Sequence, residues 1–132
     1  MSPAENKVVV QNWMAARNTN DLELALTYWT PDNHEWLSKA FQHFSIAFPD
    51  IHVTINEMIA EGDKVVALWT LIGTQHGVWR GVPGTSHMVE WHGMDVYTLS
   101  SGKIAELTRS ADHLDLLKQL GAILKWQDMV IE

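Results

Sequence analysis

Apolar positions change their spacing once along the chain, from a helical period to a strand period. Up to Pro49 they recur every three to four residues. This predicts helices over residues 4–17 and 22–29, and a third helix that begins at residue 32 or 33 and ends at Pro49. Beyond Asp50 apolar and polar residues nearly alternate, which predicts strands over residues 51–60, 64–75, 87–99 and from Gly102 to about 111.

Helices followed by an antiparallel meander predict an α+β fold in one domain over residues 1–132, with a curved sheet wrapped around the helices. Residues 61–63 predict a hairpin with a longer loop. The strand over 64–75 is apolar on both faces, so we expect helices on one face and a second copy of the chain on the other. Residues 77–86 predict a loop, and the tail from 122 to 132 either packs back as a short helix or crosses to a partner.

The junction near residue 112 combines a polar strand face with a helix start. Strict alternation places Glu106, Thr108, Ser110 and Asp112 on the face of Ile104. If this face looks into a cavity, Asp112 is a candidate acid or base. If it looks at water, Asp112 is only the cap of the following helix.

Composition narrows the possible partners. The 132 residues carry a net charge of −7 with only nine Lys and Arg, which argues against nucleic acid or an anionic membrane surface. The chain has no Cys, which removes thiolate catalysis and disulfides and fits the cytoplasm, where we expect the protein to reside. Seven of the twelve aromatic residues are Trp, which suits a cavity that accepts apolar rings or, equally, an ordinary core.

Four groups of short motifs follow one another between residues 48 and 121. They are Phe48-Pro49-Asp50, Ala60-Glu61-Gly62-Asp63-Lys64-Val65, Gly73-Thr74-Gln75-His76-Gly77 with Gly81-Val82-Pro83, and Gly102-Lys103-Ile104 through Asp112 to Gln119-Leu120-Gly121. In this order they resemble the SnoaL-like polyketide cyclases, which have the cone-shaped nuclear-transport-factor-like fold. The resemblance implies a conical pocket, an intramolecular aldol ring closure without metal or cofactor, and an acid/base role for Asp112.

The chain also departs from the family pattern. It has Gln75 where the family usually has His, and its own histidine follows at position 76, which a strand would turn to the other face. Thr108 stands where many relatives carry Trp, and the segment between Trp29 and Trp36 is shorter than usual. Substrate and reaction can therefore differ from those of the cyclases.

An aldol closure needs a base for a carbon-bound proton and a donor for the developing oxyanion. We expect Asp112 to be the acid/base and His92, beside Trp91 in a strand, to polarise a carbonyl. Both also have structural interpretations, as a helix cap and as an exposed histidine. The residues expected to bind an apolar, aromatic or polycarbonyl substrate are Trp36, Trp69, Thr108, Ser110, Trp79 and His76.

Other function classes stay open. A metal site is disfavoured because the seven histidines show no closely spaced ligand motif, so no metal or cofactor is expected. The epoxide hydrolases of the same fold place Arg and Asp two apart on a strand, whereas Arg109 and Asp112 are three apart. The alternatives are epoxide opening, a non-catalytic pocket for a hydrophobic ligand, and a dimerisation module without ligand.

Overall fold

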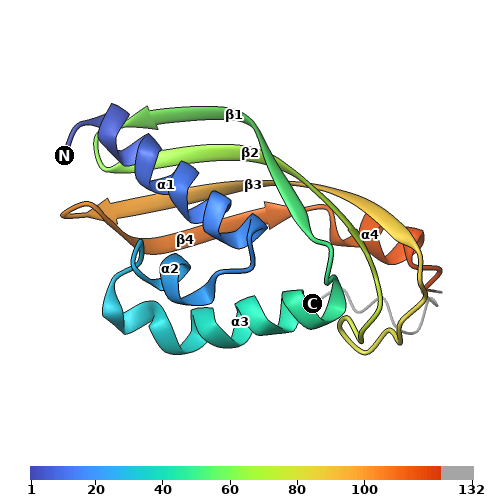
Figure 1. Ribbon diagram of the computed structural model, residues 1–132. Coiled ribbons are helices and arrows are strands. Elements are labelled where there is room, and N and C mark those ends of the chain that lie inside the picture. Colours follow the sequence, from blue (N-terminus) through green and yellow to red (C-terminus); the bar gives the residue numbers. More distant parts are fainter. Residues whose placement is uncertain (123–132) are drawn as a thin grey trace, which may run out of the picture.

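The computed structural model describes residues 1–122 and confirms the predicted α+β class, with helices packed in the concave face of a curved antiparallel sheet (Figure 1). The helices are α1 (Pro3–Asn18), α2 (Leu22–Leu26), the 3₁₀ turn η1 (Pro31–Asn33), α3 (His34–Ala47) and α4 (His113–Gln119). A capping box between Ser2 and Glu5 begins α1. None of the helices in this part of the chain is long and apolar enough to span a membrane.

Four strands form one antiparallel sheet in sequence order. They are β1 (His52–Glu61), β2 (Lys64–Thr74), β3 (Met88–Ser100) and β4 (Lys103–Ala111). Because Glu61 pairs with Lys64, only Gly62 and Asp63 lie in the first hairpin turn, so the predicted longer loop is wrong. Gly62 has φ +58°, a left-handed conformation that favours glycine.

Alternation along β2 and β3 sorts their residues onto two unlike faces. Val65, Ala67, Trp69 and Leu71 of β2 are buried beneath the helices, as is the paired set on β3 that includes Trp91. The intervening residues lie on the convex face and are half-buried or exposed. In Figure 1, α1 crosses the concave side of the sheet, and α3 runs below the sheet at the bottom of the view.

The second predicted helix is too long at its C-terminal end. It ends at Leu26, because the chain beyond it pairs with β4. The Ile104 amide donates to the Tyr28 carbonyl oxygen at 2.8 Å, and the Thr30 amide donates to the Ile104 carbonyl oxygen at 2.9 Å. The predicted placement of the tail over 122–132 lies, beyond residue 122, outside the described residues.

Candidate functional site

Two connected cavities lie between the helices and the concave face of the sheet. The inner one has a volume of about 70 Å³ and the outer one about 500 Å³. Both are lined by Ala40, Phe44, Trp91 and Arg109, so the outer space leads into the inner one. The inner wall is mostly apolar and draws on every strand and on α1 and α3. This is the concave, aromatic-lined kind of site that binds small molecules.

Tryptophans make much of the cavity wall. Trp36, at the rim with 43% exposure, and the buried Trp69 line the inner cavity, and the buried Trp79 lines the outer one. Trp91 links the two spaces, with ring centroids 5.3 Å from Trp69 and 6.0 Å from Trp79. Glycine at position 93 makes room for Trp69, because a Cβ atom there would overlap the indole ring.

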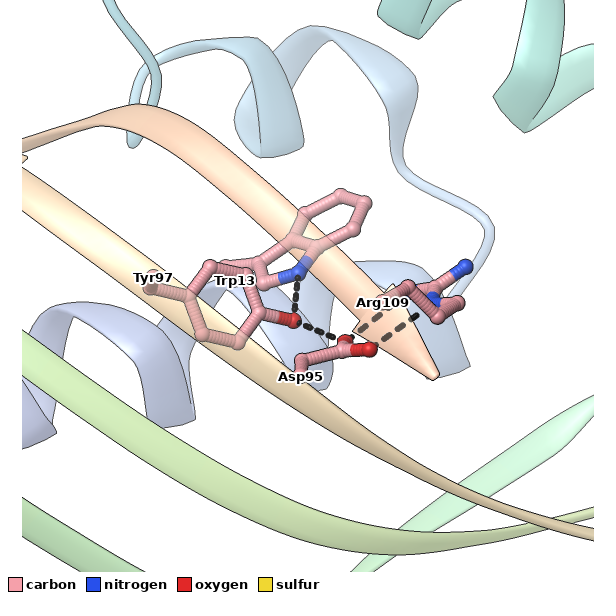
Figure 2. A network of polar contacts seen from close by, with 4 residues as sticks. All are labelled: Trp13, Asp95, Tyr97 and Arg109. Atoms are coloured by element: carbon pink, nitrogen blue, oxygen red, sulfur yellow. Dashed lines mark hydrogen bonds and ion pairs between the residues drawn. The ribbon is translucent and has the colours of Figure 1, made fainter. Parts of the chain in front are cut away.

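An ion pair between β3 and β4 (Figure 2) holds Arg109, one of the two arginines that line the inner cavity. Arg109 Nε donates to Asp95 Oδ1 at 2.7 Å and Arg109 Nη2 donates to Asp95 Oδ2 at 2.9 Å. The Asp95 side chain is fully buried, whereas Arg109 keeps 30% of its side-chain exposure. Bidentate pairing fixes the plane of the guanidinium, so Asp95 positions Arg109 at the cavities.

Two further side chains complete this network. The Tyr97 hydroxyl donates to Asp95 Oδ2 at 2.6 Å, and Trp13 Nε1 on α1 donates to the Tyr97 hydroxyl oxygen at 3.2 Å (Figure 2). Burial, followed by the charge of Asp95, raises the pKa of Tyr97 well above its ordinary value, so its hydroxyl stays a donor. Burial alone would lower the pKa of Arg109, but its hydrogen bonds to Asp95 and the charge of that carboxylate raise it.

A β-bulge decides which residues of β4 face the cavity. Leu99 pairs with Ile104 and Thr98 with Glu106, so Ala105 is an extra residue on β4. The extra residue reverses the alternation beyond Ile104 and turns Arg109, opposite Asp95, toward the helices.

The predicted polar lining of the pocket is therefore wrong. Glu106, Thr108 and Ser110 are exposed on the convex face, and none of them lines either cavity. The strict alternation from which they were predicted does not hold across the bulge at Ala105.

The outer cavity carries two histidines and a second arginine besides Arg109. His113, at the start of α4, lies against Trp91 with ring centroids 5.2 Å apart, and His43 stacks on Trp79 at 5.2 Å. Burial, then the charges of Arg80 and Arg109, lower the pKa of His113, while Asp112 acts in the opposite direction. His113 is therefore neutral at pH 7 and can accept a proton there.

Arg80 reaches the outer cavity from a tight turn. Trp79 and Val82 exchange two backbone hydrogen bonds, of 2.9 and 2.8 Å, around Arg80 at φ +46° and Gly81 at φ +82°. A left-handed conformation is unusual for Arg and marks a constrained position.

Asp112 lies at the N-terminus of α4, as predicted, and its side chain caps that helix. Its Oδ1 accepts a hydrogen bond from the Asp115 amide at 3.0 Å. The residue is exposed, and it lines neither cavity. The cavity-facing residue at this junction is the next one, His113.

His92 lies on the convex face, away from the cavities. Its neighbour Trp91 is the buried, inward residue, and Thr70, paired with His92, shares the outer face. The Thr70 hydroxyl lies 3.1 Å from His92 Nδ1 and donates to Asn56 Oδ1 at 2.8 Å. The sheet therefore separates His92 from any ligand in the cavities, and His92 lines neither of them.

His76 is also exposed and lines neither cavity; its backbone amide donates to the Ala47 carbonyl oxygen at 2.8 Å. The buried residue is Gln75, whose Nε2 donates to the Val82 carbonyl oxygen at 2.9 Å. Gln75 Oε1 accepts from the Thr85 amide and hydroxyl at 3.1 and 2.8 Å. Gln75 therefore braces the loop that carries Trp79.

Sequence reasoning missed Asp95, Arg109 and His113. One signal was present: Asp95 shares its strand face with the large residues Trp91 and Tyr97, and the face with the most apolar area is usually the buried one. A charged residue on such a face needs a partner, and Arg109 is the partner the structure provides.

Comparisons with known proteins agree with this architecture. The model of the SnoaL-like polyketide cyclase family matches residues 7–120. AclR from Streptomyces galilaeus, a proposed hydroxylase, is 28% identical with a TM-score of 0.84, over 94% of this chain and 89% of its own. None of the curated proteins compared with the chain matches it.

Two further solved structures show the same fold. TsrD from Streptomyces laurentii is 24% identical with a TM-score of 0.88, over 93% of this chain and 99% of its own. IdmH from Streptomyces antibioticus, a proposed polyketide cyclase, is 23% identical with a TM-score of 0.78, over 89% and 99%. Since the family model covers most of its length, the chain belongs to the SnoaL-like polyketide cyclase family.

Proposed function

We propose that the protein catalyses an acid/base ring closure of the aldol type on an apolar polycarbonyl substrate held in the two cavities. The observation that supports this most is the pairing of Arg109 with the buried Asp95, which holds a cationic donor against a mostly apolar wall. The chemistry uses side chains alone and needs no metal or cofactor.

Arg109 is the group proposed to stabilise the oxyanion. Its Nε and Nη2 atoms are engaged by Asp95, while Nη1 has no hydrogen-bond partner among residues 1–122. A substrate carbonyl oxygen beside Nη1 would receive a charge-assisted hydrogen bond that strengthens as negative charge develops. The apolar surroundings increase this effect because they exclude water.

His113 is the base that the geometry favours. Its imidazole lines the outer cavity that Arg109 also lines, and its lowered pKa keeps it neutral. One ring nitrogen takes the proton from the carbon next to the carbonyl, and Arg109 stabilises the enolate oxygen. The enolate carbon attacks the second carbonyl, and the resulting alkoxide recovers the proton from His113.

Asp112 is the alternative base, which the family resemblance predicted. Asp112 is one residue away from His113, but it lines neither cavity and its carboxylate is engaged with the Asp115 amide. To act, it would have to leave the cap and turn toward the cavity. Replacing Asp112 and His113 separately distinguishes the two assignments.

The reaction can be tested with a panel of aryl diketones such as 1-phenylhexane-1,5-dione, whose ring closure and loss of water give an absorbing conjugated enone. We expect turnover by the wild type and a loss of about 100-fold for His113→Gln, the usual size of a general-base contribution. Asp112→Asn should lose little activity. Equal rates for the wild type and buffer across the panel contradict the proposal, and a large loss confined to Asp112→Asn moves the base to that residue.

We also propose that two copies pair through the convex face of the sheet. Four large apolar side chains are exposed on this face: Ile59 at 55%, Ile72 at 42%, Met88 at 71% and Met94 at 43%. A patch of this kind is typical of protein interfaces. The polar residues His92 and Thr70 between them would contact the partner rather than substrate.

A further inference from the structure

Arg17 occupies a core position of α1. It follows Val10, Trp13 and Met14 on the buried face of the helix and is itself only 5% exposed. Helical spacing calls for an apolar residue at this place, because the face packs against the core. A guanidinium there conflicts with the local pattern, and such conflicts concentrate at functional sites.

The charge of Arg17 has no counter-charge nearby. Within residues 1–122 no carboxylate oxygen lies within 4.0 Å of it, since the ion pairs there are Lys39–Glu35 and Arg109–Asp95. Burial lowers the pKa of Arg17 to about 10, so it remains charged at neutral pH. Burying an unpaired charge is unfavourable, which indicates that something else completes its environment.

Most hydrogen-bonding capacity of Arg17 is unused. Nη1 donates to the Phe41 carbonyl oxygen at 3.1 Å, and Nη2 donates to Ser45 Oγ at 2.9 Å. Nε is buried without a partner in the described part of the chain, and the guanidinium lies 3.8 Å from the centre of the Phe41 ring. Of five N–H donors, two are therefore satisfied.

Arg17 also lines the inner cavity, but unlike Arg109 it has no carboxylate partner in the described part of the chain. The charge of Arg109 is neutralised by Asp95, so the inner cavity carries one uncompensated positive charge, that of Arg17. We propose that the cavity binds apolar ligands that carry one carboxylate, and that this carboxylate pairs with Arg17. The inference deepens the proposed function, on which it rests, by making the substrate an apolar keto acid.

The second cation that a carboxylate could choose is Arg80. It is exposed at the outer cavity, where water hydrates it and weakens any ion pair. Arg80→Gln is therefore a matched control: it removes one positive charge from the outer cavity and leaves the lining of the inner cavity unchanged.

The test measures binding of naphthalene-2-carboxylate and of its neutral amide, naphthalene-2-carboxamide, by quenching of the cavity tryptophans. We expect the wild type to bind the carboxylate at least tenfold more tightly than the amide. Arg17→Met, which keeps the packing over Phe41, should lose the carboxylate preference and change the affinity for the amide by less than threefold. Arg17→Lys should recover part of the preference, and Arg80→Gln should retain it.

Three results overturn the proposal: equal wild-type affinities for the two probes, equal losses of both in Arg17→Met, or a preference that disappears only in Arg80→Gln. If Arg17→Met does not fold, NMR of the wild type decides. The Arg17 Nε–H resonance should shift with the carboxylate and not with the amide, and an unmoved resonance rejects the pairing.

These binding measurements need no turnover. The proposed ligand class can therefore be rejected without rejecting the proposed reaction, and the reverse also holds. If the carboxylate binds to Arg17 but no substrate undergoes ring closure, the aldol function is contradicted and the proposed ligand class stands. Turnover of neutral diketones without a carboxylate preference would contradict the ligand class and keep the function.

Discussion

The two faces of the sheet carry polar residues in very different surroundings. On the concave face Asp95 and Arg109 form a buried, bidentate pair at the cavity, braced by Tyr97. On the convex face His92 and Thr70 form a hydrogen bond exposed to solvent. The concave pair is charged and cut off from water, whereas the convex pair is neutral and open to it.

The contrast shows where chemistry is possible on a curved sheet. On the concave side the Asp95 carboxylate is fully shielded from water, so charges and donors near it act strongly on one another and on a ligand. Groups on the convex side act through high dielectric and contribute little to either stability or catalysis. Substitutions on the two faces should therefore have effects of different size on stability and activity, even when they remove similar groups.

The largest effect on stability is expected for Asp95→Asn. It leaves Arg109 without its carboxylate in a partly buried site, and breaking a buried pair typically costs about 3–5 kcal/mol. Thr70→Val, which removes a hydrogen bond on the convex face, should cost about 1 kcal/mol or less. Urea unfolding of both variants measures the contrast, and equal losses would contradict it.

Gly93→Ala should have the next largest effect. The new Cβ atom would overlap the Trp69 ring, so the indole or the strand must shift, and such overpacking typically costs about 1–3 kcal/mol. His92→Ala, one residue away on the convex face, should change the free energy of unfolding by about 0.5 kcal/mol or less. A Gly93→Ala protein as stable as the wild type would show that Trp69 is not fixed in this position.

Met94→Lys tests the convex face as an interface. A charge in the centre of an apolar contact is unfavourable, so the dimer dissociation constant should rise about tenfold or more, equivalent to about 1.4 kcal/mol. Sedimentation measures this directly. A wild type that is monomeric at all concentrations removes the interface proposal and leaves the cavity site unaffected.

The smallest effect is a shift in pH dependence. His113 must be neutral to act as a base, so activity should fall as the pH drops through its lowered pKa. Arg80→Gln removes one of the two positive charges that lower this pKa, while Arg109 and Asp112 remain beside it. The acid limb of the kcat/KM profile should therefore move to higher pH, and an unmoved or opposite limb would contradict the role of His113.

Much of the fold could be predicted from the sequence, because the change from helical to strand spacing is carried by many residues at once. The orientation of β4 could not, since it depends on one bulge at Ala105 that leaves no clear sequence signal. Strict alternation from Ile104 therefore selected Thr108 and Ser110 instead of Arg109 for the cavity.

Trp36, Trp69 and Trp79 line the cavities; Trp69 and Trp79 are buried there, as large apolar side chains usually are, whereas Trp36 stays partly exposed at the rim. The polar candidates fared differently. Asp112 and His113 are adjacent in sequence, and only the geometry of the junction shows that the second one faces the cavity. His92 lies on the outer face because the side of β3 that carries Trp91 and Asp95 is the one that meets the helices.

Catalysis on the concave face of the sheet is the central proposal. The most direct test compares kcat/KM for ring closure of an aryl diketone between Arg109→Lys, which keeps the charge beside Asp95 but loses the planar donor, and His92→Gln. We predict a loss of about 100-fold or more for Arg109→Lys, the size expected for a missing oxyanion donor. His92→Gln should stay close to the wild type. A large loss for His92→Gln with an unchanged Arg109→Lys would contradict the account.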